Sequence, residues 1–136
     1  LQKGLADDIM DVIATDHAPH AASEKDQGIQ KAPFGIVGLE TAAALTYTAL
    51  VKPGILTPMQ MAEKMSYNPA KILGLDKGTV EAGSPADLTI FDPECEWVID
   101  PAEFLSKGKN TPFGGKKVTG KVMATIVDGE IVYQEK

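Results

Sequence analysis

The chain has 136 residues, of which 13 are cationic and 19 acidic, giving a net charge of −6 and a pI near 4.8. This acidic balance argues against nucleic acid or an anionic membrane as a main partner. The single cysteine excludes an internal disulfide, and no apolar run reaches the length of a membrane span. A reducing, cytoplasmic location fits these features.

The first 30 residues predict a helix, a strand and a loop. Apolar residues at positions 1, 5 and 9 have helical spacing, and the small and β-branched residues of 11–15 predict a buried strand. The polar stretch 18–30 is long for a connection, and such loops are usually functional or mobile. We expect it to lie over the carboxyl end of the strand, where a lid belongs.

Three helices are expected next, over residues 35–51, 57–65 and 70–73. Thr57, Pro58 and Gln60 form an N-cap, a first-turn proline and a capping-box partner for the second helix. Pro69 is expected to separate the second helix from the third, which Gly74 ends.

After residue 75 the pattern changes to short runs that indicate antiparallel strands, expected at 87–92, 96–99, 120–127 and 130–133. Residues 101–105 read as one helical turn. The Asp128-Gly129 dipeptide is typical of a type I′ hairpin turn between the last two strands. The chain therefore divides into a first segment, 1–75, and a β segment, 76–136.

Polar groups crowd the carboxyl end of the strand at 11–15, where α/β proteins place their chemistry. Asp16 could bind a divalent metal through oxygen, act as a general base, or do both. His17 and His20 follow it. An aspartate that caps the next turn, with two surface histidines, explains the same spacing equally well.

The segment ATDHAPH (residues 14–20), followed by APFGIVGLET (residues 32–41), resembles the last barrel strand and following loop of bacterial-type dihydroorotases. These are zinc-dependent cyclic amidohydrolases of pyrimidine synthesis. The TDH triplet also occurs in hydantoinases and allantoinases, so His20 and the Pro33-Phe34-Gly35 loop are what favour dihydroorotase. The resemblance covers essentially the whole chain, through the segment NTPF (residues 110–113), which we expect to be structural, and on to the last strands.

This resemblance implies an α/β fold, the C-terminal part of an amidohydrolase (β/α)8 barrel with its last strand and following helices, plus part of a small antiparallel β-sandwich. A complete barrel needs roughly 250 residues. The His-x-His pair that the family carries on its first strand is absent, and the chain begins with Leu1. We therefore expect a C-terminal segment of a longer enzyme, inactive alone, whose remaining sandwich strands lie elsewhere.

The resemblance also implies roles for individual residues. The aspartate matching Asp16 binds Zn²⁺, one of two in the full-length enzyme, and carries a proton to the departing amide nitrogen. His20 matches an imidazole that binds the substrate carboxylate. Phe34 and Gly35 match a loop whose main chain contacts the pyrimidine ring, where glycine permits close approach. His17 adjoins the site without an assigned metal role.

The implied reaction is the reversible hydrolysis of dihydroorotate to N-carbamoyl-aspartate. The implied partners are this small-molecule substrate, further copies of the chain in a homo-oligomer, and aspartate transcarbamoylase. One alternative is another cyclic amidohydrolase, an allantoinase or dihydropyrimidinase. Another is a non-catalytic, dihydroorotase-like scaffold for aspartate transcarbamoylase. A third is a folded segment without a function of its own, whose exposed strand edges associate with one another.

Overall fold

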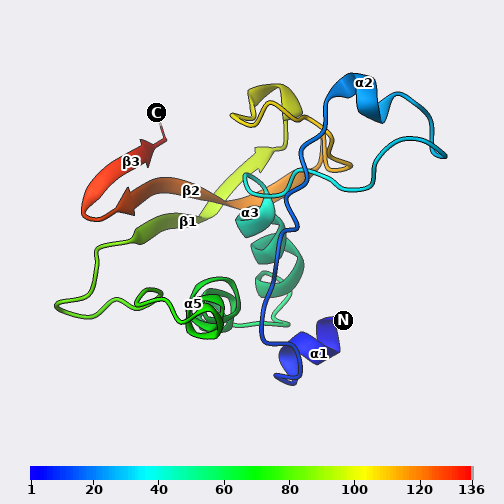
Figure 1. The fold of residues 1–136 in the computed structure, drawn as a ribbon. Coiled ribbons are helices and arrows are strands. Elements are labelled where there is room, and N and C mark those ends of the chain that lie inside the picture. The colour runs from blue at the N-terminus through cyan, green and yellow to red at the C-terminus, as the bar shows by residue number, and fades with distance from the viewer. Residues whose placement is uncertain (136) are drawn as a thin grey trace.

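A computed structural model describes residues 1–135, which form a three-stranded antiparallel sheet with short helical elements both below and above it in the view of Figure 1. The strands lie in the order β1 (Leu88–Val98), β2 (Lys117–Val127) and β3 (Glu130–Gln134). The α-helices are α1 (Gln2–Ala6), α2 (Ala22–Lys25), α3 (Ala42–Thr46), α4 (Pro58–Ala62) and α5 (Asn68–Leu73). Two π-helical turns, η1 (Tyr47–Val51) and η2 (Glu63–Tyr67), and one 3₁₀ turn, η3 (Pro101–Glu103), complete the chain.

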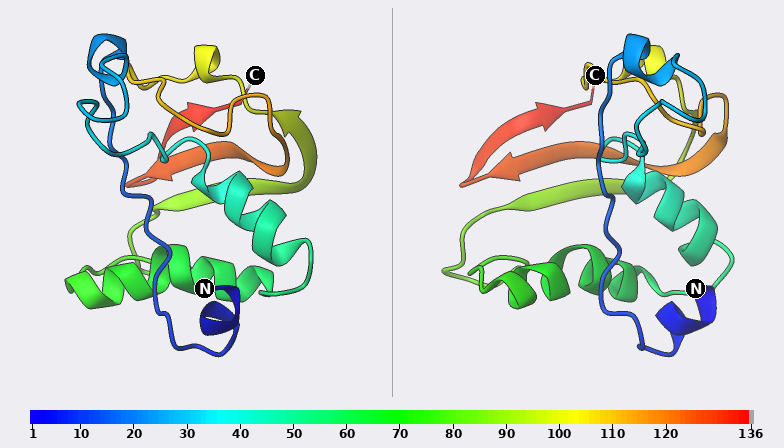
Figure 2. Two further views of the ribbon diagram at one scale, coloured as in Figure 1. Left: turned by 90° about the vertical axis from the view of Figure 1, so that its right-hand side faces the viewer. Right: turned by 45° about the vertical axis from the view of Figure 1, so that its right-hand side comes forward.

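The strand predicted at 11–15 is not formed. This stretch runs as a long extended connection from α1 to α2 (Figure 2). Its regular contacts are a hydrogen bond from Ile13 N to Lys64 O and an isolated parallel bridge between His17 and Ile36. A barrel strand exists only through hydrogen bonds to parallel neighbours, and residues 1–135 supply none along 11–15. The antiparallel sheet expected after residue 75 is present. The barrel part of the expected fold is not shown by residues 1–135.

The predicted helix at 35–51 begins too early. Gly35 has φ 110°, outside the helical region, and Gly38 packs so closely on Thr15 that a Cβ would lie 3.1 Å from its carbonyl oxygen. Helical geometry starts only at Ala42, and the expected polar loop before it contains the single turn α2. Tertiary contact with the extended stretch thus overrides the helical pattern in residues 35–41.

The predicted break at Pro69 is also wrong. Tyr67 and Asn68 have helical dihedrals, so α4, η2 and α5 form one continuous helix that ends at left-handed Gly74. Pro69 has no N–H to give to the Lys64 carbonyl five residues earlier, and Ile13 N donates to that carbonyl instead. A long-range hydrogen bond therefore satisfies the group that proline leaves without a partner. The Thr57–Gln60 capping box is confirmed.

The β segment follows the prediction closely. The two strands expected at 87–92 and 96–99 join into the single strand β1, whose pairing with β2 is irregular between Asp92 and Glu96. Asp128 and Gly129 have φ values of 49° and 84°, as a type I′ turn requires. The helical turn expected at 101–105 is η3.

Two apolar clusters hold the elements together, and the chain beyond η1 turns back so that the helix 58–73 lies away from the sheet (Figure 2). The first cluster packs α3 against β2 and against the segment that connects β1 to β2. Its buried residues are Val37, Ala44, Ile99, Phe104 and Val118. The second lies between α1, η1 and α4, with buried Leu5, Val51 and Leu56. The first cluster contains residues from before and after residue 75. The division of the chain into 1–75 and 76–136 remains our proposal. In residues 1–135, no helix has the length and apolar character to cross a bilayer.

Asp87 fastens the start of β1 to the hairpin turn, and we expect its replacement to make the sheet's stability less dependent on pH. Its carboxylate is ion-paired with Lys77 and accepts from Asp128 N at 2.8 Å, and the Lys77 contact is the main cause that lowers the pKa of Asp87. A lowered folded-state pKa gives stability that is present above pH about 4 and is lost as the pH falls through the folded value. Asp87→Asn should lower the Tm at pH 7 by a few degrees and by much less at pH 3. An equal loss at both pH values, measured by circular dichroism, would rule out this electrostatic account.

Candidate active site

Asp16 stands at the end of the extended stretch with an exposed side chain and a φ of 43°. Aspartate is one of the few residues that tolerate this left-handed conformation. Within residues 1–135, its carboxylate takes part in no hydrogen bond or ion pair, so it does not cap the following turn. The conformation thus presents a free carboxylate at the place where the sequence predicts one.

His17 links this position to the segment that precedes α3. Its Nδ1 accepts hydrogen bonds from Gly38 N at 3.1 Å and Leu39 N at 3.4 Å. In the neutral ring the proton is then on Nε2. Together with the parallel bridge to Ile36, these contacts give His17 a structural role and exclude Nδ1 as a metal ligand in this arrangement.

His20 is joined directly to the loop that contains Phe34 and Gly35. Its Nε2 lies 2.9 Å from Phe34 O and donates to it, and its Nδ1 lies 3.8 Å from the Glu24 carboxylate. The two loops that the sequence marks as substrate-binding therefore form one hydrogen-bonded unit beside the end of the extended stretch. The Phe34 side chain is 93% exposed, so only its main chain takes part.

Position 35 requires glycine because the loop that contains it approaches the loop at residues 18–20 closely. A Cβ built on it would lie 2.4 Å from the Ala18 Cβ, well inside contact distance, and its φ of 110° suits only glycine. This close approach is between two segments of the chain, and the expected approach of Gly35 to a substrate ring stays a prediction.

Two residues that sequence reasoning did not place in the site also hold this loop. Lys25 Nζ donates to Pro33 O at 2.8 Å and to Gly35 O at 3.1 Å. Asn110, expected only as architecture, donates to Gly35 O at 3.1 Å. Contacts from a side chain to a carbonyl carry no sequence pattern, so Lys25 gave no signal. The only signal for Asn110 was its place in the resembling segment 110–113.

A metal ion would need ligands from outside these residues. Within residues 1–135, no three His, Cys, Asp or Glu side chains gather at a metal-binding distance. Asp16 offers a free, exposed oxygen donor, which suits one position in a divalent metal site. His17 Nδ1 and His20 Nε2 are already engaged. The residues present therefore fit the role of one zinc ligand, which Asp16 would fill.

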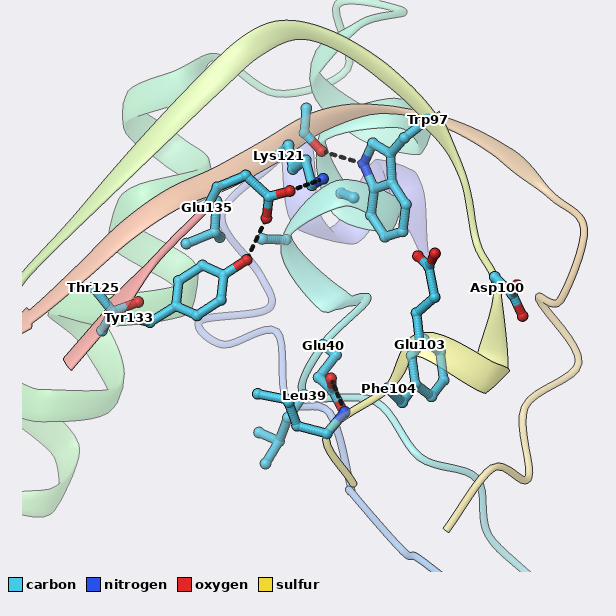
Figure 3. Close-up of a pocket in the computed structure, with 15 residues that line it drawn as sticks. Leu39, Glu40, Trp97, Asp100, Glu103, Phe104, Lys121, Thr125, Tyr133 and Glu135 are labelled. Carbon is cyan, nitrogen blue, oxygen red and sulfur yellow. Dashed lines mark hydrogen bonds and ion pairs between the residues drawn. The ribbon is translucent and has the colours of Figure 1, made fainter. Parts of the chain in front are cut away.

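A separate cavity of about 480 Å³ lies between α3 and the sheet and contains none of the predicted site residues (Figure 3). On its wall the Glu135 carboxylate pairs with Lys121 Nζ at 2.5 Å and accepts from the Tyr133 hydroxyl at 2.5 Å. The Lys121 contact lowers the pKa of Glu135, and the hydrogen bond to Glu135 raises the pKa of Tyr133. These groups satisfy one another, which identifies them as a structural network.

Residues 1–132 match the amidohydrolase family model, and the chain belongs to this family. It is 54% identical to the dihydroorotases of Pelotomaculum thermopropionicum and Bacillus cytotoxicus and 52% identical to that of Halalkalibacterium halodurans, in each case over all 136 residues. Each match covers 32% of the relative, so the chain spans about a third of the length of these curated relatives.

Solved structures of similar shape are hydantoinases and dihydropyrimidinases. The L-hydantoinase (dihydropyrimidinase) from Arthrobacter aurescens is 34% identical with a TM-score of 0.91, over 98% of this chain and 31% of that one. The dihydropyrimidinase from Brevibacillus agri is 27% identical with a TM-score of 0.92, over 98% of this chain and 30% of that one. The backbone arrangement of these residues is thus shared with the matching parts of proteins named hydantoinase and dihydropyrimidinase.

Proposed function

We propose that these residues are the C-terminal segment of a dihydroorotase, which hydrolyses the ring amide of dihydroorotate reversibly to N-carbamoyl-aspartate in pyrimidine synthesis. The observation that carries this proposal is the His20–Phe34 hydrogen bond. It joins the two dihydroorotase-like segments into one unit beside Asp16. The 52–54% identity to proteins named dihydroorotase supports it.

Asp16 would move the proton in this reaction. Its unpaired carboxylate can take a proton from the attacking water and deliver it to the amide nitrogen, which is a poor leaving group until it is protonated. Zinc, held by Asp16 together with ligands from outside the chain, would polarise the ring carbonyl and lower the pKa of the attacking water. Hydrolases of this kind commonly use two metal ions, and two zinc ions would occupy the site in the complete enzyme.

His20 would bind the substrate carboxylate. Its Nε2–H already donates to Phe34 O, so the ring can donate a hydrogen bond to a substrate carboxylate in two ways. Either it carries a second proton on Nδ1, or the carboxylate takes the place of the Phe34 carbonyl. Both leave Gly35 next to His20, where its lack of a side chain allows the ring of the substrate to approach the main chain.

The structural neighbours favour a second candidate of the same reaction type, a dihydropyrimidinase or hydantoinase. The substrates separate the two, because a carboxylate-binding His20 has a purpose only if the substrate has a carboxylate. The higher identity to dihydroorotases supports the first candidate.

We also propose a cytoplasmic, homo-oligomeric complete enzyme that associates with aspartate transcarbamoylase. Large apolar side chains are exposed here, among them Ile29 at 95% and Leu105 at 83%. Further protein that covered these residues would remove their apolar surface from water.

The proposal is tested by zinc content and dihydroorotate hydrolysis, measured on the 136-residue chain and on the longest protein that contains it. We expect both only in the longer protein. If the longer protein contains no zinc and has no activity, the scaffold alternative is supported. Activity in the 136-residue chain alone would show that the metal ligands have been assigned to the wrong part of the protein.

Replacing His20 by Ala in the longer protein should lower kcat/KM for dihydroorotate by about tenfold to a hundredfold, mostly through KM, because a hydrogen bond to a charged group is lost. Zinc content, measured by atomic absorption, should not change. Loss of zinc in His20→Ala would instead make His20 a metal ligand.

A further inference from the structure

The side chain of Asn110 makes three hydrogen bonds, all to main-chain atoms of the two loops of the candidate site. Its Oδ1 accepts from His20 N at 3.1 Å. Its Nδ2 donates to Ala18 O at 3.0 Å and to Gly35 O at 3.1 Å. One side chain from the β segment, 90 residues from His20, therefore bonds to the main chain on both sides of the His20–Phe34 contact.

The backbone around Asn110 reinforces this contact. Val37 N donates to Asn110 O at 3.0 Å. Gly108 lies directly on Pro19, because a Cβ at Gly108 would be 2.7 Å from the Pro19 Cβ. Residues 108–110 thus clamp both loops at once, the first through residues 18–20 and the second through residues 35–37.

The chemistry of the amide explains why asparagine stands here. Two carbonyls and one N–H converge on position 110, and a carboxamide of this length offers two donors and an acceptor to match them. Gly35 O keeps a second donor, Lys25 Nζ, when Asn110 is removed. His20 N and Ala18 O, both in the loop that carries His20, have no other partner within residues 1–135. Removal therefore acts chiefly on the placement of His20.

We propose that Asn110 is a positioning residue for substrate binding, which fixes the His20 imidazole against the Phe34–Gly35 loop. The proposal deepens, and rests on, the assignment of His20 to the substrate carboxylate. Asn110 touches no substrate itself and acts through His20. The β segment would then hold the binding geometry of a site whose chemical groups come from the first 35 residues.

The first test is a double-mutant cycle in the longer protein. Asn110→Ala should raise KM for dihydroorotate about tenfold and leave kcat within about twofold, with zinc content unchanged. In the His20→Ala background it should have little further effect on KM, because contacting residues are coupled. A matched control is Asn68→Ala, which also removes an amide bonded to a backbone carbonyl, Asp11 O, but away from these loops. Its KM should stay at the wild-type value.

The second test needs no activity. Amide hydrogen exchange at His20 should become about tenfold faster or more in Asn110→Ala, since its acceptor is lost. Exchange at Val37 should stay slow, because its acceptor is the main chain of residue 110. Unchanged protection at His20, loss at both amides, or fully multiplicative KM effects would overturn the inference. If the wild-type protein does not hydrolyse dihydroorotate, the proposed function is overturned. Faster exchange at the His20 amide alone in Asn110→Ala would still establish the positioning contact.

Discussion

Asp16→Asn in the longer protein should reduce kcat by about 10²-fold to 10⁴-fold, the range lost with a general acid–base group. Asparagine has nearly the same shape and also tolerates a left-handed backbone, which Asp16 adopts with φ 43°. The substitution therefore removes the proton-carrying carboxylate and largely spares the turn. Asp16→Ala should be at least as harmful, because alanine adds backbone strain to the lost charge.

The measurements are steady-state hydrolysis of dihydroorotate and zinc content for both variants. Because the carboxylate of Asp16 has no protein partner within residues 1–135, little loss of folding stability is expected from Asp16→Asn. Residual activity above about a tenth of wild type would exclude Asp16 as the proton carrier, since general acid–base catalysis is worth more than that.

Gly35→Ala should have the second large effect, through geometry. The new Cβ would meet the Ala18 Cβ at 2.4 Å, and φ 110° is strained for alanine by about 1–3 kcal/mol. The two loops must separate, which breaks the contact between His20 and Phe34. We expect kcat/KM to fall about a hundredfold, together with a lower Tm in thermal unfolding.

Two further variants separate the clash from the backbone strain. Gly28 has a φ of 80°, and a Cβ added to it would have no other atom within 4 Å, so Gly28→Ala carries conformational strain alone and should leave KM unchanged. Adding Ala18→Gly to Gly35→Ala removes the clashing methyl group and should restore part of the lost activity. A double variant no better than Gly35→Ala would show that the close approach of Ala18 and Gly35 is not what the site needs.

Local patterns in the sequence predicted the elements that local physics controls. The Thr57–Gln60 cap, the Gly74 helix end and the Asp128-Gly129 turn each depend on neighbouring residues only, and all are present. The helix start before Ala42 and the break at Pro69 were mispredicted. In both places a contact with the extended stretch, through Gly38 or through Ile13 N, decided the conformation.

Residue type and order identified Asp16, His20 and the Phe34–Gly35 loop as candidates for chemistry, and their roles in it stay predictions. What holds these groups in place became visible only in the folded chain. Asn110 lies 90 residues from His20, and Lys25 binds the main-chain carbonyl of Gly35. Such contacts depend on how separate segments pack, for which no local spacing carries a signal.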